Sequence, residues 1–270
     1  MKPVKVLDLG SKRCDALTLA KDAADTTGID VTIERMKVFR LAPHLTLALL
    51  AACASQPAAA PASIGACQST INVYGSRTEL NEHPDTVAVS LRDVALSPNA
   101  IGYGPGAGYL AELTVVDGVW QIARATGPGA VTVDTVPGEN AGAMFLVTAS
   151  PDAWAKRTLD TPVEGMTDLE AMISKSAASS GCGAGAVPFK LTGKIQDADW
   201  SVVGRPSGAR GRIDETAVTL IGLYDPVEAD RYFMPKGRSI HVHILTGDGR
   251  LSGHLDDFAS LEAGTLSLPE

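Results

Sequence analysis

Residues 241 to 254 of the chain read His241-Val242-His243-Ile244-Leu245-Thr246-Gly247-Asp248-Gly249-Arg250-Leu251-Ser252-Gly253-His254. This stretch holds three of the five histidines in the sequence. Side chains on a strand repeat every second residue, so His241 and His243 are predicted to point to one face. The glycines around Asp248 are typical of a hairpin turn, which folds the next strand back alongside the first. The third imidazole, that of His254, is therefore expected to face the other two.

The residue types in this hairpin point to a metal site. Three imidazoles that leave a fourth position open are typical of a catalytic zinc site, whereas a structural zinc site is closed by four protein ligands. A lone histidine is usually structural, but three at hairpin spacing are not readily explained as core residues. We therefore predict that His241, His243 and His254 bind zinc.

Around this hairpin, the chain is predicted to fold mainly into short strands. Short apolar runs alternate with clusters of Gly, Pro, Asn and Asp, which are turn signals. A helix is predicted at 167–174, with Thr167 as N-cap and Glu170 three residues further on, and a second short helix at 91–96. The strands are expected at 86–91, 113–116, 131–136, 144–148, 217–223 and 239–245.

The predicted fold class is α+β and predominantly β. We expect two β-rich halves, a mixed sheet and a small barrel-like sheet, with few short helices, in one domain at 67–270. The Ser/Gly/Ala-rich segment 176–186 is interpreted as a soft boundary between the halves. The Gly-rich segment 102–108 lacks the strand-glycine-helix context and the lysine of a phosphate loop, so no nucleotide site is expected there.

The charge balance limits the partners of the folded part. Residues 1–52 hold 8 of the 23 basic and 6 of the 31 acidic residues, which leaves the rest with a net charge of −10. A surface of that sign disfavours nucleic acid and anionic lipid as partners. The remaining residues, about 218, are enough for one large or two small packed units.

The segment 36–52 is predicted to be an export signal. A basic start at 36–40 precedes an apolar run at 41–52 that is too short to span a bilayer as a mature helix. The run ends in Leu50-Ala51-Ala52-Cys53, which resembles the lipobox of bacterial lipoproteins. That resemblance implies cleavage before Cys53 and lipidation of its sulfur, with 53–66 as a flexible tether. A buried core helix is the alternative interpretation of the apolar run.

Residues 1–35 are unexpected in front of an export signal. They are polar and lack a clear apolar face. Our hypothesis is that translation starts at Met36 and that 1–35 is a non-native extension. The mature protein would then be held by its lipid anchor alone at the periplasmic face of a bacterial membrane, with the outer membrane favoured.

The remaining cysteines agree with export. Cys67 and Cys182 form an even pair within the expected domain. In an oxidising compartment, such a pair predicts one disulfide, although two free thiols are the alternative.

Several further segments resemble bacterial α-acetolactate decarboxylases. The His-x-His and third His match the spacing of that family without a gap. The segment 111–121 is similar to the family's Gly-Glu-Leu and Leu-Asp-Gly motifs. The resemblance covers most of 85–265 in patches, and its strongest parts are Ile221-Gly222-Leu223-Tyr224-Asp225-Pro226, 235–243 and 248–258.

The resemblance implies roles for individual residues. His241, His243 and His254 match the family's zinc-binding histidines, and Glu112 matches a glutamate that approaches the metal. The family's active-site arginine is assigned to Arg205, with Arg210 and Arg212 as competitors. A second acidic residue of the family's C-terminal tail has no clear counterpart, and Glu262 and Glu270 are the candidates.

These residue types suit decarboxylation of a small 2-hydroxy-3-oxo acid, 2-acetolactate, to acetoin. Loss of carbon dioxide leaves electron density that zinc can stabilise as a Lewis acid. A guanidinium such as that of Arg205 can hold the carboxylate, and Glu112 can relay the proton. The resemblance also leaves a homodimer open.

Two other functions are compatible with the same residues. A cupin-like metal oxygenase also uses His-x-His, but no Glu follows His243 at short spacing, and bound iron instead of zinc would favour it. An exported lipoprotein could also bind metal or a small hydroxy acid on a decarboxylase-like scaffold without turnover.

Overall fold

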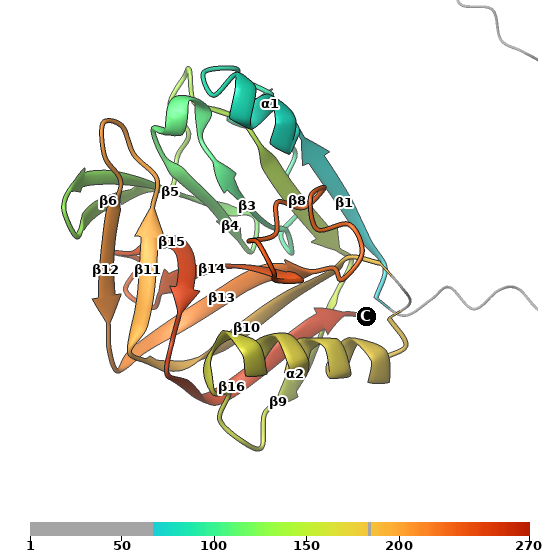
Figure 1. The fold of residues 1–270 in the computed structure, drawn as a ribbon. Helices are drawn as coiled ribbons and strands as arrows, with labels where there is room; N and C mark the ends of the chain where they lie inside the picture. Colours follow the sequence, from blue (N-terminus) through green and yellow to red (C-terminus); the bar gives the residue numbers. More distant parts are fainter. Residues whose placement is uncertain (1–66, 183–184) are drawn as a thin grey trace, which may run out of the picture. The chain divides into compact units, whose positions relative to one another are not determined.

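A computed structural model of the protein describes residues 67–182 and 185–270 (Figure 1). The predicted extension 1–35, the signal 36–52 and the lipidated Cys53 with its tether at 53–66 lie outside the described residues. Across the described ranges, no helix has the length and apolar character needed to cross a membrane.

Two antiparallel sheets form most of this structure. The six-stranded sheet has the order β1 (Ser69–Tyr74), β8 (Leu146–Pro151), β3 (Ile101–Pro105), β4 (Glu112–Val116), β5 (Val119–Gly127), β6 (Ala130–Asp134). The eight-stranded sheet has the order β12 (Ala209–Ile213), β11 (Ala198–Val202), β15 (Ser252–Asp257), β14 (Ile240–Thr246), β13 (Thr216–Tyr224), β10 (Val187–Gln196), β16 (Ser260–Pro269), β9 (Trp154–Thr158). A third, two-stranded sheet pairs β2 (Val89–Ser90) with β7 (Gly142–Ala143).

Helices are few and short. The described residues contain α1 (Arg77–Glu82), α2 (Gly165–Ser179) and two 3-10 turns, η1 (Leu91–Asp93) and η2 (Ala107–Tyr109). Figure 1 shows α2 along the outer side of the eight-stranded sheet. The predicted β-rich fold with few helices is confirmed. The sheets are antiparallel rather than mixed, however, and none closes into a barrel.

Most predicted strands are present with shifted ends, but three local predictions differ from the structure. The predicted helix at 91–96 is only the 3-10 turn η1 at Leu91–Asp93, because the chain is extended from Val94. Within the predicted strand 86–91, only Val89–Ser90 pairs as β2, because the chain turns into η1 at Leu91. The predicted N-cap Thr167 lies inside α2. At the start of α2, a carboxylate oxygen of Asp168 accepts a hydrogen bond from the backbone N of Glu164. A carboxylate oxygen of Asp257 on β15 accepts one from the backbone N of Met166. A tertiary contact therefore moved the start of this helix.

Successive side chains of a strand point to opposite faces of the eight-stranded sheet, and each face carries its own hydrophobic core. Ile240, Val242 and Ile244 of β14 pack with α2 in the core on one face. A second core lies between the two large sheets and includes Tyr103 of β3 and Ile221 of β13. Because the even-numbered residues of β14 face α2, its odd-numbered residues face the six-stranded sheet.

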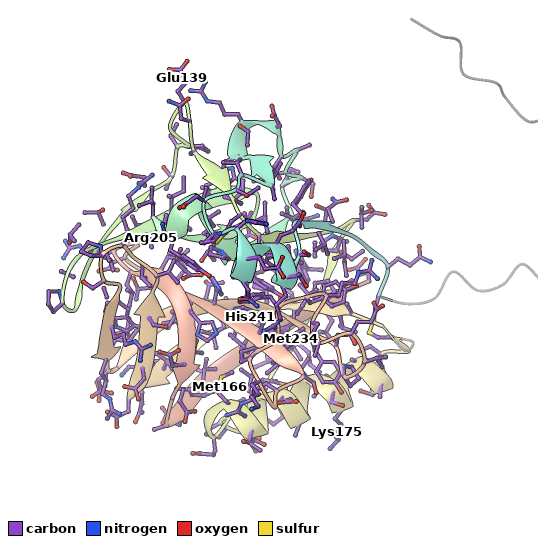
Figure 2. All side chains as sticks on the ribbon, turned by 45° about the horizontal axis from the view of Figure 1, so that its top comes forward. Glu139, Met166, Lys175, Arg205, Met234 and His241 are labelled. Carbon is purple, nitrogen blue, oxygen red and sulfur yellow. A yellow bond between two sulfur atoms is a disulfide. The ribbon has the colours of Figure 1, made fainter. Side chains whose placement is uncertain are left out.

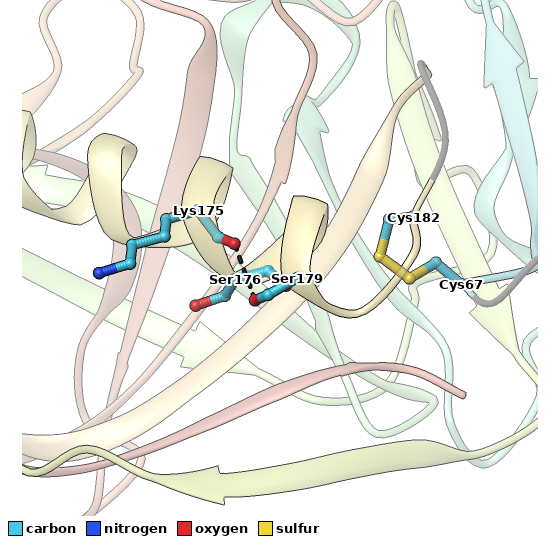
Figure 3. The surroundings of a disulfide bond; sticks show 5 residues. All are labelled: Cys67, Lys175, Ser176, Ser179 and Cys182. Atoms are coloured by element: carbon cyan, nitrogen blue, oxygen red, sulfur yellow. Dashed lines mark hydrogen bonds between the residues drawn. A yellow bond between two sulfur atoms is a disulfide. The ribbon is translucent and has the colours of Figure 1, made fainter.

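A disulfide joins Cys67 to Cys182, with a Cα–Cα distance of 5.1 Å (Figure 3). It links the residues just before β1 to the segment after α2, 115 residues further along the chain. The segment 176–186 that we interpreted as a boundary therefore includes the end of α2 and Cys182 of this bond. The end of α2 is also bonded locally, because Ser179 Oγ donates to the carbonyl of Lys175 at 2.9 Å.

Candidate metal centre

The structure brings the three predicted histidines together on one face of the β14–β15 hairpin. His243 pairs directly with His254 across the two strands, and His241 lies two residues before His243 on β14. The ring centres are 5.3 Å apart for His241 and His243, 4.9 Å for His241 and His254, and 5.8 Å for His243 and His254. The predicted turn at 247–249 therefore sets the register that places all three rings side by side.

Each ring makes a hydrogen bond through Nδ1. His241 Nδ1 is 2.8 Å from the carbonyl oxygen of Phe233, and His254 Nδ1 is 2.9 Å from a carboxylate oxygen of Asp256. His243 Nδ1 is 2.8 Å from Thr114 Oγ1 on the facing sheet. A carbonyl and an ionised carboxylate only accept, so Nδ1 of His241 and His254 carries the hydrogen, and Nε2 keeps its lone pair. This pattern of supported histidines is typical of metal ligands.

Electrostatics keep two of the rings neutral. Burial lowers the pKa of His241 well below its ordinary value, and the neighbouring His254 lowers it further. Burial also lowers the pKa of His243 well below its ordinary value, because the side chain is fully buried, and the neighbouring His241 lowers it further. Burial acts to raise the pKa of Asp256, but the hydrogen bond with His254 lowers it overall. Two neutral imidazoles and an ionised acceptor for the third are the forms that metal binding requires.

Glu112 lies beside these rings at the start of β4. Its Oε1 is 3.6 Å from His243 Nε2, and its Oε2 accepts a hydrogen bond of 3.2 Å from the backbone N of Val203. Burial raises the pKa of Glu112 to about 7, with smaller and mostly opposing contributions from its neighbours. The carboxyl group can therefore gain or lose a proton near neutral pH.

The spacing of the rings fits a metal ion, but the placement of the side chains does not. An ion about 2.0–2.1 Å from a nitrogen of each ring lies about 3 Å from the ring centres, which separates those centres by about 5 Å in a tetrahedral site. His243 Nε2 is buried without a hydrogen-bond partner among the described residues, as expected for a nitrogen reserved for a ligand. Within 67–182 and 185–270, however, no group of three or more His, Cys, Asp or Glu side chains is placed to hold a metal ion as it stands. The donor types and the ring spacing thus fit zinc, whereas the placement of the side chains does not itself form a metal site.

A cavity of about 270 Å³ opens next to the rings, and we call it the histidine cavity. Its size is near the lower end for ligand pockets, which suits a molecule of few atoms. Tyr103 packs behind it, with its ring centre 4.2 Å from that of His241 and 5.4 Å from that of His243. The cavity is lined by Arg77, Pro105, Tyr109, Glu112, Ser201, Val203, Phe233, Met234, Pro235, His241 and His254.

Arg205 borders a different cavity. This neighbouring cavity, of about 500 Å³, includes Arg205 and Arg210 and shares Tyr109, Ser201 and Val203 with the histidine cavity. The Arg205 guanidinium forms an ion pair of 2.7 Å with Asp85. Figure 2 shows Arg205 away from the closely placed His241 and Met234.

The other candidates from the sequence also lie elsewhere. Arg212 is paired with Asp199 at the surface. Glu262 accepts a hydrogen bond from Gln196 on an exposed part of β16. Glu270, the last residue, is exposed, and neither glutamate lines the histidine cavity.

The sequence prediction missed four residues that shape the site: Arg77, Tyr103, Thr114 and Phe233. Thr114 follows Glu112 by two residues on β4, so strand periodicity placed both on one face and could have indicated it. The other three carried no local signal, because they reach the histidines only through the packing of distant segments.

Comparisons with protein-family models and with curated proteins found no match for this chain. Solved structures do match. Acetolactate decarboxylase from Bacillus subtilis subspecies spizizenii has a TM-score of 0.60 at 16% identity, over 74% of this chain and 85% of that chain. Alpha-acetolactate decarboxylase from Bacillus subtilis strain 168 has a TM-score of 0.58 at 17% identity, over 74% and 84%.

A third solved structure is a Staphylococcus aureus protein of unknown function that is described as similar to alpha-acetolactate decarboxylase. It has a TM-score of 0.59 at 12% identity, over 73% of this chain and 84% of that chain. At these identities the likeness shows the fold alone. The chain therefore has an acetolactate decarboxylase-like scaffold.

Proposed function

We propose that this protein is a zinc-dependent decarboxylase that converts 2-acetolactate to acetoin. The observation that carries the proposal is the set of three adjoining imidazoles, each bonded through Nδ1, with Glu112 beside them. The decarboxylase-like scaffold supports it. A small 2-hydroxy-3-oxo acid suits the size of the histidine cavity.

His241, His243 and His254 would hold the zinc ion. When bound, the ion supplies Lewis acidity toward the hydroxyl and keto oxygens of the substrate. The imidazoles of His241 and His243 contribute by remaining neutral, since neutral ligands leave the positive charge of an ion undiminished. Their Nδ1 bonds to Phe233 and Thr114 hold the rings against rotation.

Glu112 is the proposed proton carrier. Cleavage of the bond to the carboxylate releases carbon dioxide and moves the electron pair toward the keto group, so a carbon of the product must then gain a proton. A carboxyl group beside the rings can hold that proton and release it, and Glu112 Oε1 lies 3.6 Å from His243 Nε2. The backbone N of Val203 fixes one carboxylate oxygen and leaves the other toward the rings.

Arg205 is the residue that the family resemblance proposes for binding the substrate carboxylate. In its present position it would act from the neighbouring cavity, across the shared lining residues Tyr109 and Ser201. It would also have to leave Asp85, which an incoming carboxylate could replace because that ion pair is exposed.

The test is an acetoin assay on purified, zinc-loaded protein that is given racemic acetolactate. We expect acetoin from the wild type, and loss of both bound zinc and turnover in His243→Ala. Glu112→Gln is the matched variant, which should retain zinc and lose most turnover. Acetoin formation by metal-free His243→Ala would contradict the proposal.

The second candidate is a lipoprotein that binds metal or a small hydroxy acid without turnover. One observation favours it, because neither Glu262 nor Glu270 supplies a second acid to the histidine cavity. Tight zinc binding by the wild type with no acetoin would support this candidate. Iron as the metal purified with the protein would instead favour an oxygenase.

We also propose that the protein is exported and anchored by lipid at Cys53. The Cys67–Cys182 disulfide supports an oxidising compartment. Mass spectrometry of the protein made in its own cells tests this proposal. Peptides from residues 1–35, or an unmodified Cys53, would contradict it.

A further inference from the structure

Arg77 is the one lysine or arginine among the described residues that line the histidine cavity. It is the first residue of α1. Its Nη2 donates a 2.7 Å hydrogen bond to the carbonyl oxygen of Met234, which is 157 residues further along the chain. Its positive charge therefore belongs to the same cavity as His241, His254 and Glu112.

The guanidinium is held in place by the segment that also orients a histidine. Arg77 Cζ lies 4.3 Å from the ring centre of Phe233, which is a cation–π contact. The carbonyl oxygen of the same Phe233 accepts from His241 Nδ1. Arg77 and His241 are thus positioned against each other through one residue, as preorganised binding groups are.

The guanidinium also has N–H donors that make no hydrogen bond among the described residues. Arg77 Nε is buried and makes no hydrogen bond among the described residues, although Asp230 Oδ1 lies 3.2 Å away. Nη1 likewise has no hydrogen-bond partner in the described part of the chain. Asp230 is 91% exposed, so this ion pair is weak and an incoming anion can compete with it.

We propose that Arg77 binds the carboxylate of the substrate in the histidine cavity. This rests on the proposed function and deepens it, because it assigns the anion-binding group to a residue outside the family-like motifs. A planar guanidinium pairs with a carboxylate through two parallel N–H donors. Once the carboxylate leaves as neutral carbon dioxide, this attraction is lost, which favours release. The ligand class is a small monocarboxylic acid with a neighbouring hydroxyl group.

Arg205 is the competing candidate for this role, and its variant tests the two arginines against each other. It borders the neighbouring cavity and is already paired at 2.7 Å with Asp85. The variants Arg77→Met and Arg205→Met remove one guanidinium each, whereas Arg77→Lys keeps the charge and removes the fork.

The probe is 2,3-dihydroxy-2-methylbutanoate, in which reduction of the ketone removes the acceptor for the electron pair and prevents decarboxylation. Its uncharged amide is the matched ligand. Calorimetric titration of the zinc-loaded proteins measures the dissociation constants, and elemental analysis measures the zinc content of each variant.

For Arg77→Met we expect binding of the acid to weaken about 10- to 100-fold, as for the loss of a charge-assisted pair of hydrogen bonds. Binding of the amide should change by less than about 3-fold, and Arg77→Lys should fall between Arg77→Met and the wild type. Arg205→Met should weaken binding of the acid by less than Arg77→Met does.

Three results would overturn the inference: no binding of the acid by the wild type, loss only in Arg205→Met, or loss of zinc from Arg77→Met. Arg77-dependent binding of the acid in a protein that makes no acetoin would refute the decarboxylase and leave the carboxylate site standing. The two proposals can therefore fail separately.

Discussion

The buried carboxyl group of Glu112 makes the stability of the metal-free protein depend on pH. Its pKa is raised by burial from an ordinary value of 4.5 to about 7. The native state therefore favours the neutral form more than the unfolded chain does. The resulting stabilisation is fully present below pH 4.5 and is lost as the pH rises through 7.

Glu112→Gln removes this titration and keeps the shape of the side chain. A tenfold change in a protonation equilibrium is about 1.4 kcal/mol, so the pKa difference corresponds to about 3 kcal/mol. The Gln carbonyl can still accept from the backbone N of Val203. We expect the variant to match the wild type at pH 4.5 and to exceed its free energy of unfolding by about 3 kcal/mol at pH 8.

The assay is urea unfolding of both proteins in a chelator, with the disulfide intact, at several values between pH 4.5 and pH 8. Both proteins retain the histidines, so the titration of those residues in the unfolded chain is the same in both. With zinc bound, an ionised carboxylate near the cation is favourable, so the advantage of the variant should shrink or reverse. A stability difference that does not change with pH would refute the assignment of a raised pKa to Glu112.

Two further predictions concern stability. Replacing both Cys67 and Cys182 by Ser opens a loop of 115 residues and should lower the free energy of unfolding by about 4 kcal/mol, as measured by urea titration. A change below about 1 kcal/mol would show that the disulfide contributes little to stability. Tyr103→Phe removes the buried 2.7 Å hydrogen bond from the Tyr103 hydroxyl to the carbonyl of Tyr232 but keeps the ring against His241. We expect the free energy of unfolding in urea to fall by about 1–2 kcal/mol with unchanged zinc content. A fall in zinc content would show that the hydroxyl also supports the metal site.

The sequence predicted the parts of the site that depend on spacing along one strand or one turn. The alternation of His241 and His243 and the glycines around Asp248 lead directly to the observed pairing of His243 with His254. The capping pattern of Thr167 and Glu170 predicts a helix at 167–174, whereas the observed helix α2 spans Gly165–Ser179 and begins earlier. Asp257 stabilises the first turn of α2 by accepting a hydrogen bond from the backbone N of Met166, which is 91 residues away in the sequence. Rules based on neighbouring residues do not include such a partner.

The placement of the arginines shows the same limit more sharply. Arg205 was assigned by a motif in the loop after β11, yet the structure puts it in a neighbouring cavity beside Asp85, 120 residues away. Arg77 was not considered, because a six-residue helix leaves little periodic signal. Which guanidinium enters the histidine cavity depends on how α1 packs against the 225–239 loop.

The sequence by itself determined the local geometry of the three histidines, because strand periodicity and turn preferences act over a few neighbouring residues. Only the tertiary structure decided what surrounds them. Thr114 meets His243 across 129 residues, and Arg77 meets the carbonyl of Met234 across 157. Such contacts arise from the burial of two sheet faces against each other, and residue spacing along the chain carries no record of which side chains that burial will join.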